Sequence, residues 1–185
     1  MKFEKVNKYQ FIEDYLRTQN AEGYNADFFR REAAIAYDKH VIIPTRASAH
    51  SAGYDFVTPF SLSIEPGETI VVPTGIKCDM RTRKSYVVGG MSYADVFLQM
   101  HIRSSIGIRH HVILSNCTGI IDADYYNNPD NEGDIHLALT NIGHDTFEAA
   151  AGERLAQGII TEFFRAENDF FTSEDRSGGI GSSGK

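Results

Sequence analysis

The sequence predicts an all-β fold, a jelly-roll-type β barrel, with a short helical extension at the N-terminus. Two observations support this fold class. From Val41 onward the chain consists of short β-type runs separated by turn residues, such as those at 65–67, 73–75 and 141–143. Many short strands at close spacing are typical of barrels and sandwiches. Before Val41, by contrast, apolar residues recur at helical spacing.

The helical spacing is clearest in residues 8–19. Four apolar residues recur there at helical intervals: Phe11, Ile12, Tyr15 and Leu16. Gly23 interrupts this segment, and Asn25 or Asp27 is placed to cap a second helix that reaches about Ala36. We expect the two segments to form a helical hairpin that packs on the main domain or on a neighbouring subunit. Nothing in this hairpin suggests catalytic chemistry.

Short β-type runs follow through the remainder of the chain. The expected strands lie at 69–72, 86–88, 96–102, 112–114, 135–139 and 155–164. The C-terminal segment at 175–185 has too few apolar groups to fold by itself. We therefore expect three parts: a helical extension at 1–40, a β domain at 41–174, and a flexible glycine- and serine-rich arm at 175–185.

The composition favours a globular protein that binds neither nucleic acid nor membranes. The formal net charge is −7, whereas nucleic-acid binders are usually basic. Cys78 and Cys117 have no spacing typical of a disulfide framework or a zinc site. No run of about 18 apolar residues predicts a membrane span. These features predict a soluble, cytoplasmic protein.

Two nucleotide-binding patterns occur near the C-terminus. Residues 179–184 fit G-x-G-x-x-G and, together with Lys185, most of a Walker A loop. Both motifs require a helix after the loop to aim backbone amides at phosphate, and the sequence predicts none. Glycines nevertheless allow close backbone approach to an anion, and serine hydroxyls donate to phosphate. The segment with Arg176 is therefore either an arm that closes over a triphosphate or a disordered terminus.

Two groups of polar residues are further candidates. Asp122 and Asp124 are spaced to hold a metal or to activate water, although two acids in a polar loop are also typical of a solvated hairpin. An apolar run is followed by Arg103, Ser104 and Ser105. Their guanidinium and hydroxyl groups are good hydrogen-bond donors to phosphate oxygens. The alternative is a strand end that meets solvent. The residues alone leave these alternatives open.

Taken in order, five segments carry a resemblance to a known family. They are Ala52–Phe56, Arg103–Gly107, Asn116–Tyr125, Gly152–Gln157, and Arg176 with Gly178–Gly184. From about Val41 to the C-terminus the chain resembles the trimeric dUTPase family, which shows five motifs in this sequence. Each segment alone is weakly specific, whereas five in order at comparable separations are a specific signature. The resemblance implies a dUTP diphosphatase that produces dUMP and pyrophosphate, lowering dUTP and supplying dUMP for thymidylate synthesis.

The resemblance also implies a homotrimer with active sites at subunit interfaces and Mg²⁺ held mainly by the substrate phosphates. Asp122 matches the acid that activates water for attack on the α-phosphorus. Asp55 matches an acid that contacts the metal through water or organises the site. The other matched residues are expected to bind substrate: Arg103, Ser104, Ser105 and Gln157 near the phosphates; Asn116, Gly119, Ile120, Ile121 and His136 at the uracil; Tyr125 at the deoxyribose; and Arg176, Gly179, Ile180, Gly181, Ser182 and Ser183 in the closing arm.

The sequence departs from the family pattern in three places. Residues 126–132 lengthen the hairpin tip, which leaves the local register and the assignment of His136 open. Ile180 stands where the family carries a phenylalanine, so aromatic stacking on the base, about 1–3 kcal/mol, is lost. One residue is missing between Arg176 and the following pair of glycines, which alters the reach of the arginine.

Two other functions are considered. The related dCTP deaminases carry a glutamate in the strand after the hairpin, because deamination needs a proton shuttle. Ala138 occupies that position here and cannot transfer protons. The second alternative is a nucleotide-sensing regulatory protein on the same scaffold, and only the helical extension at 1–40 encourages it. Hydrolysis of dUTP is the preferred prediction.

Overall fold

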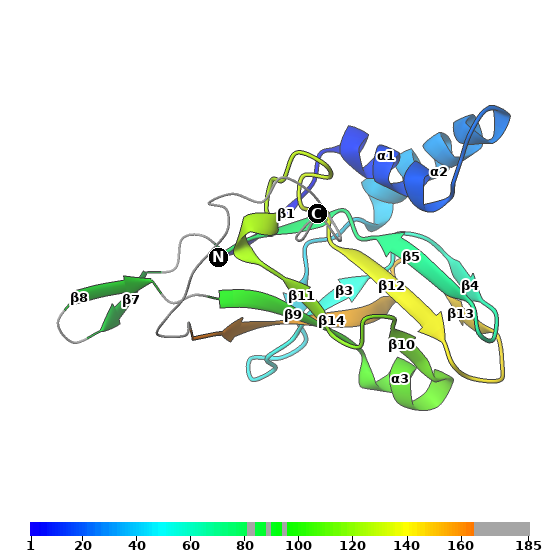
Figure 1. Ribbon diagram of the computed structural model, residues 1–185. Helices are drawn as coiled ribbons and strands as arrows, with labels where there is room; N and C mark the ends of the chain where they lie inside the picture. The colour runs from blue at the N-terminus through cyan, green and yellow to red at the C-terminus, as the bar shows by residue number, and fades with distance from the viewer. Residues whose placement is uncertain (81–83, 88–89, 94–95, 165–185) are drawn as a thin grey trace.

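The computed structural model describes residues 1–164 apart from 81–83, 88–89 and 94–95, and the expected arm at 175–185 lies outside this range. Strands dominate the described part, and helices lie at its edges (Figure 1). Each strand pair is antiparallel. The all-β prediction is confirmed, although the strands form several hydrogen-bonded sheets rather than one closed barrel. No helix in the described ranges is long and apolar enough to cross a membrane.

The largest sheet has five strands in the order β11-β9-β14-β3-β2. Its strands are β11 (Gly119–Ile121), β9 (Val96–Ile102), β14 (Arg154–Glu162), β3 (Tyr54–Val57) and β2 (Thr45–Arg46). A three-stranded sheet, β10-β12-β5, consists of β10 (Val112–Leu114), β12 (His136–Asn141) and β5 (Thr69–Pro73). Smaller pairs join β1 (Lys2–Lys5) to β6 (Ile76–Asp79), β13 (Phe147–Ala149) to β4 (Leu62–Ile64), and β7 (Lys84–Val87) to β8 (Gly90–Tyr93).

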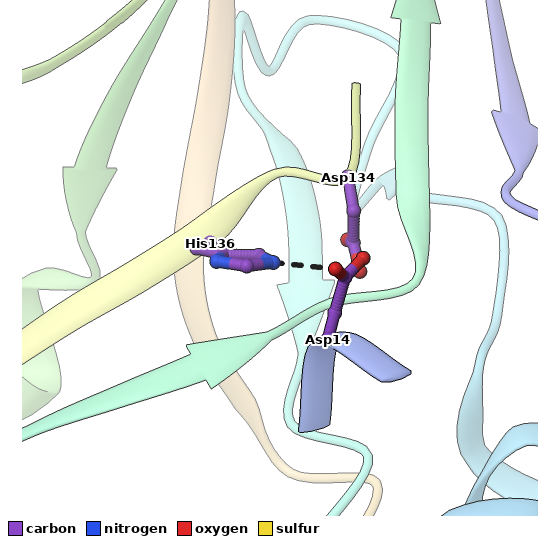
Figure 2. A group of neighbouring side chains, drawn as sticks. All are labelled: Asp14, Asp134 and His136. Carbon is purple, nitrogen blue, oxygen red and sulfur yellow. Dashed lines mark ion pairs between the residues drawn. The ribbon is translucent and has the colours of Figure 1, made fainter. Parts of the chain in front are cut away.

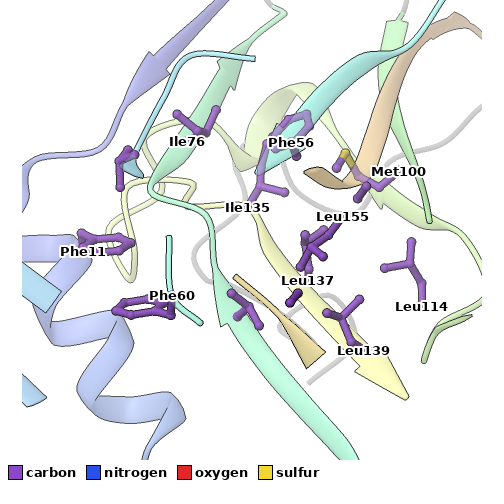
Figure 3. Close-up of a cluster of buried hydrophobic side chains, with 14 of the residues drawn as sticks. Phe11, Phe56, Phe60, Ile76, Met100, Leu114, Ile135, Leu137, Leu139 and Leu155 are labelled. Atoms are coloured by element: carbon purple, nitrogen blue, oxygen red, sulfur yellow. The ribbon is translucent and has the colours of Figure 1, made fainter. Parts of the chain in front are cut away.

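The main core is built from alternate residues of the strands. Every second side chain of β9 and of β12 is buried, as a strand with one face toward a core requires. These inward-facing residues meet others from β10 and β14 in one cluster (Figure 3). Its members include Leu98, Met100, Leu114, Leu137, Leu139 and Leu155.

The N-terminal helices pack on the β domain. Helix α1 (Lys8–Thr18) begins at Asn7, whose side chain accepts a hydrogen bond from the backbone N–H of Gln10 at 2.9 Å. Its apolar side faces β5 and the loop after β3 (Figure 1). There Phe60 stacks on Tyr15, with ring centroids 3.8 Å apart, and on Phe11 at 5.7 Å. Of the two expected packing partners, the contacts identify the main domain.

Helix α2 (Tyr24–His40) is longer than expected at both ends. The prediction that Asn25 or Asp27 caps it is wrong. The N-cap is Gly23, with φ 62°, and no side chain caps the helix there. Glycine adopts this conformation easily because it has no Cβ, so the chain turns sharply between the two helices. The helix continues to His40 rather than Ala36 because Tyr37 packs against Phe11.

Two short elements were not predicted from the sequence. Strand β1 was expected to be part of a helical extension, but it pairs with β6 along its whole length. Helix α3 (Ser104–His110) follows β9. Its start contains Ser104 and Ser105, which were expected at a strand end or as phosphate contacts. Both elements are short, and tertiary contacts rather than local periodicity determine them.

Candidate active site

A pocket of about 440 Å³ lies between the β11 hairpin, β12 and the end of β10. It contains six of the expected substrate residues: Asn116, Gly119, Ile120, Ile121, Tyr125 and His136. Apolar groups from Val71, Met100 and Leu114 complete the lining. A mostly apolar pocket with a few polar groups suits a flat heterocycle that carries hydrogen-bonding edges.

The register of β11 fixes one wall of this pocket. Ile120 pairs with Gln99, and Gly119 pairs with Met100. A Cβ added to Gly119 would lie 3.0 Å from the Cβ of Met100, so a larger residue would move the hairpin off β9. Glycine here therefore lets the hairpin backbone lie close against the sheet beside the pocket.

Tyr125 is fixed at the end of the same hairpin. It lies in the short 3-10 helix η1 (Ala123–Tyr125) and is buried. Its hydroxyl donates to the backbone oxygen of Asp134 at 3.0 Å and accepts from Nδ2 of Asn131 at 2.8 Å. The ring lines the pocket while its polar end is held by the protein. A rigid aromatic wall of this kind suits the packing of a sugar.

The longer hairpin tip folds on itself rather than extending into the pocket. The backbone N–H of Asn127 donates to the carbonyl of Glu132, and Nδ2 of Asn128 donates to Oδ1 of Asn131 at 2.8 Å. Lys77 on β6 contacts Asn127 and Glu132, at 2.7 and 3.2 Å. The chain then enters β12 with His136 opposite Pro73. The register left open by the sequence thus places His136 in the pocket lining.

Asp122 follows β11 directly and precedes η1. Its backbone is extended, and its carbonyl accepts a hydrogen bond from the N–H of Tyr125 at 3.1 Å. The side chain is exposed. Asp122 directly follows Ile121, which lines the pocket, so its exposed carboxylate is accessible to water next to the lining residues.

A second cluster lies at the other end of the five-stranded sheet. Asp55 on β3 is largely buried, and its two carboxylate oxygens pair with Nε of Arg103 at 3.3 Å and with NH1 of Arg154 at 3.0 Å. Gln157 lies opposite Asp55 in the register of β14 and β3. Arg154 lies in the fourth motif segment, Gly152–Gln157, but no role was predicted for it from the sequence. The pairings hold Arg103 at the start of α3.

Ser104 and Ser105 are exposed in the first turn of α3. The backbone N–H of Arg103 donates to the carbonyl of Leu155 at 2.9 Å, which ties this turn to β14. Two hydroxyls and a guanidinium therefore lie side by side at one end of the sheet. Close by, a Cβ added to Gly53 would lie 2.5 Å from Oε1 of Gln157, so a larger residue there would displace the Gln157 amide from its position.

Asp122 and this cluster lie toward opposite ends of β9, whereas the pocket itself reaches Met100 near the middle of the strand. Ile121 pairs with Leu98, so Asp122 emerges near residue 97, whereas Arg103 follows the other end of the strand. The separation of about six residues along β9 corresponds to about 20 Å at about 3.3 Å per residue. A triphosphate is shorter than this. Asp122 and Arg103 are therefore not adjacent along the sheet of one chain.

The expected residues of the closing arm, Arg176, Gly179, Ile180, Gly181, Ser182 and Ser183, lie outside the described residues. Asp55, the expected metal contact, has both oxygens paired with arginines. Its negative charge is thus compensated, which does not suit direct coordination of Mg²⁺ but leaves room for contact through water. These residues fit a magnesium ion held by substrate phosphates better than a metal bound by the protein alone.

Comparisons with known proteins agree on one family. The sequence model of the family described as dUTPase matches residues 39–184. A deoxyuridine 5'-triphosphate nucleotidohydrolase from Lactococcus lactis is 38% identical over 143 residues, which cover 77% of this chain and 87% of that protein. The enzyme of the same name from Paraburkholderia xenovorans is 37% identical over 149 residues, with coverages of 77% and 89%.

The fold of this chain is also similar to that of a solved structure. The crystal structure of a dUTPase from Streptococcus mutans has a TM-score of 0.62 and 29% sequence identity. The match covers 90% of this chain and 99% of that one. The alignment with the solved chain therefore extends beyond the five motif segments into the N-terminal region.

Proposed function

This chain belongs to the dUTPase family and is a dUTP diphosphatase, and we propose that Asp122 activates the water that attacks the α-phosphorus of dUTP. The carboxylate accepts the proton of the water as its oxygen bonds to phosphorus, and pyrophosphate leaves as dUMP forms. The observation that carries this assignment is the position of Asp122. It is exposed and lies in sequence between two residues that line the pocket, Ile121 and Tyr125.

The phosphate chain is bound by the cluster around Asp55. Arg103, with Ser104 and Ser105, supplies donors for the phosphoryl oxygens. Asp55 and Arg154 act as positioning residues, since the ion pairs at 3.3 and 3.0 Å hold Arg103 in place. Gln157 orients a phosphate oxygen or a water molecule. A bound Mg²⁺ neutralises charge on the triphosphate and so makes the α-phosphorus easier to attack.

The active site is proposed to form between subunits of a homotrimer. The separation of about 20 Å along β9 between Asp122 and Arg103 supports this proposal. The Asp122 carboxylate of one subunit would act on a nucleotide whose phosphates are bound by the Arg103 cluster of another. The arm at 175–185, with Arg176 and Ile180, closes over the nucleotide from the C-terminal end. The pocket reads uracil through Asn116 and the hairpin backbone at 119–121.

Tyr125 is proposed to select deoxyribose by leaving no space for a 2′-hydroxyl. We expect Tyr125→Ala to reduce the preference for dUTP over UTP by at least about tenfold, because the buried ring is the wall against which the sugar packs. Tyr125→Phe is the matched control, since it keeps the ring and removes the hydroxyl bonded to Asp134. The ratio of kcat/KM for the two nucleotides measures the effect. An unchanged ratio in Tyr125→Ala would place sugar recognition elsewhere.

A substrate panel tests the reaction itself. Pyrophosphate release from dUTP, dCTP, dTTP and UTP, with and without Mg²⁺, is expected to be fast only with dUTP and Mg²⁺. The same samples assayed for ammonia address deamination. Ala138 lines the pocket where a deaminase carries its glutamate, so no ammonia is expected from dCTP. Ammonia release would contradict the proposed chemistry.

A further inference from the structure

Three side chains with metal-binding atoms meet behind the nucleobase pocket (Figure 2). Asp14 comes from α1, Asp134 from the segment before β12, and His136 from the start of β12. The Asp14 and Asp134 side chains are 1% and 0% exposed. Oxygen or nitrogen atoms of all three residues lie within 4.8 Å of one another. Each side chain points toward the other two.

The inward-facing atoms of this cluster have no hydrogen-bond partner among the described residues. They are Oδ2 of Asp14, Oδ2 of Asp134 and Nε2 of His136, all buried. Nε2 of His136 and Oδ2 of Asp134 are paired at 3.7 Å (Figure 2), a separation longer than a hydrogen bond, so neither atom has its hydrogen-bonding capacity satisfied by the other. Buried polar atoms are nearly always satisfied in proteins, so three that converge on one point indicate a ligand.

The outward-facing oxygens, by contrast, are anchored by the protein. Oδ1 of Asp14 accepts from Nε2 of Gln10 at 2.9 Å, and Oδ1 of Asp134 accepts from the backbone N–H of Gly75 at 2.8 Å. Metal-binding side chains are commonly oriented in this way, because the hydrogen bonds to the remote atoms fix the direction of the ligating atoms.

The charge of the cluster points to a cation. Burial, and then the neighbouring Asp134 carboxylate, raises the pKa of Asp14 to about 7, and burial likewise raises the pKa of Asp134. Arg17 reaches Oδ1 of Asp14 from the solvent side, at 3.7 Å, and leaves the inner oxygens uncompensated. Burial lowers the pKa of His136, but the Asp134 carboxylate raises it and the net shift is upward, so the imidazole is drawn into the same cluster. The two carboxylates and this imidazole present two oxygens and one nitrogen to one point, as a divalent cation requires.

We propose that Asp14, Asp134 and His136 bind a divalent transition-metal ion of the Zn²⁺ type through these three inward-facing atoms. Imidazole nitrogen with carboxylate oxygen is a ligand set that suits Zn²⁺, Mn²⁺ or Co²⁺, whereas Mg²⁺ takes oxygen. Zn²⁺ bonds to nitrogen and oxygen at about 2.0–2.2 Å, so small side-chain rotations draw the three atoms together. A water molecule completes a tetrahedral site.

This ion would clamp the N-terminal helix to the active-site region. Asp14 belongs to α1, while His136 lines the nucleobase pocket. The metal therefore ties α1 to β12 at the pocket wall, at a place separate from the Mg²⁺ proposed on the triphosphate.

Metal titration of the full-length protein tests the proposal. Chelator-treated protein is titrated with Zn²⁺ by calorimetry, and thermal unfolding is followed with Zn²⁺ or with Mg²⁺. We expect one Zn²⁺ per chain and a higher Tm with Zn²⁺ than with Mg²⁺. Asp14→Asn preserves the volume of the side chain and removes the ligating charge. We expect at least about tenfold weaker Zn²⁺ binding and no Zn²⁺-dependent rise in Tm in this variant.

Asp130→Asn is the matched control. Asp130 carries the same group nearby, pairs with Arg17 and is exposed, but lies outside the cluster. It should bind Zn²⁺ as the unmodified chain does. A Co²⁺ absorption spectrum typical of nitrogen and oxygen ligands, lost in Asp14→Asn, would identify the site spectroscopically. Equal Zn²⁺ affinity in Asp14→Asn and Asp130→Asn, or no binding in the unmodified chain, would overturn the proposal.

Discussion

Replacing Asp122 by asparagine is expected to lower turnover of dUTP by about two orders of magnitude or more while nucleotide binding persists. Asparagine has the shape of aspartate but cannot accept the proton of the attacking water. The position directly before η1 also tolerates asparagine, since Asn and Asp serve equally well before a helical turn. The fold should therefore be unchanged, and the loss should appear in kcat rather than in the Kd of a non-hydrolysable dUTP analogue.

Asp124→Asn provides the control for this experiment. Asp124 is an exposed carboxylate two residues further along the same turn. It shares the local negative charge of Asp122 but not its position directly after β11. We expect near-normal turnover in Asp124→Asn. Equal activity in the two variants would remove Asp122 from the mechanism, and a large loss in Asp124→Asn alone would move the base to that residue.

Many of the residues that line the pocket were expected to lie together because they belong to one motif segment. Asn116 to Tyr125 form one hairpin, and pairing of β11 with β9 keeps them together. His136 was harder to place, since the inserted tip made its register ambiguous. The hydrogen bonds within the tip, such as that between Asn128 and Asn131, show how the insertion folds away without shifting β12.

Residues that act across elements were missed. Arg154 lies next to Asp55 because β14 pairs with β3, a contact between residues 99 positions apart in sequence. Asp14 meets Asp134 because α1 packs against the end of β5. A lone aspartate on an amphipathic helix resembles a solvated surface residue. Only tertiary packing reveals that it is buried beside another carboxylate.

The N-terminal helices also contribute to the same hydrophobic cluster as the strands. Phe11 of α1 and Ala33 of α2 are fully buried together with Phe56 and Ile76. The sequence predicted helices that pack on the main domain or on another subunit. It could not predict how deeply they insert, because the aromatic contacts depend on Phe60, which lies in the loop between β3 and β4.

Phe11→Ala is expected to lower the free energy of unfolding by about 3–5 kcal/mol. The Phe11 ring is 0% exposed, stacks on Phe60 and contacts Tyr37. A Cβ added to Gly75 would lie 3.0 Å from this ring, so β-domain backbone closes around it and leaves a cavity when the ring is removed. Urea unfolding, followed at a fixed protomer concentration, measures the change.

Phe28→Ala is the matched control, because it deletes the same ring from α2 where the side chain is 66% exposed. Its loss should stay within about 0.5 kcal/mol. If α1 were an appendage that can detach from the β domain, Phe11→Ala would melt only the helices. The unfolding of the strands would then be unchanged, and the two variants would behave alike. A single cooperative transition shifted only in Phe11→Ala would instead establish that α1 is part of the core of the β domain.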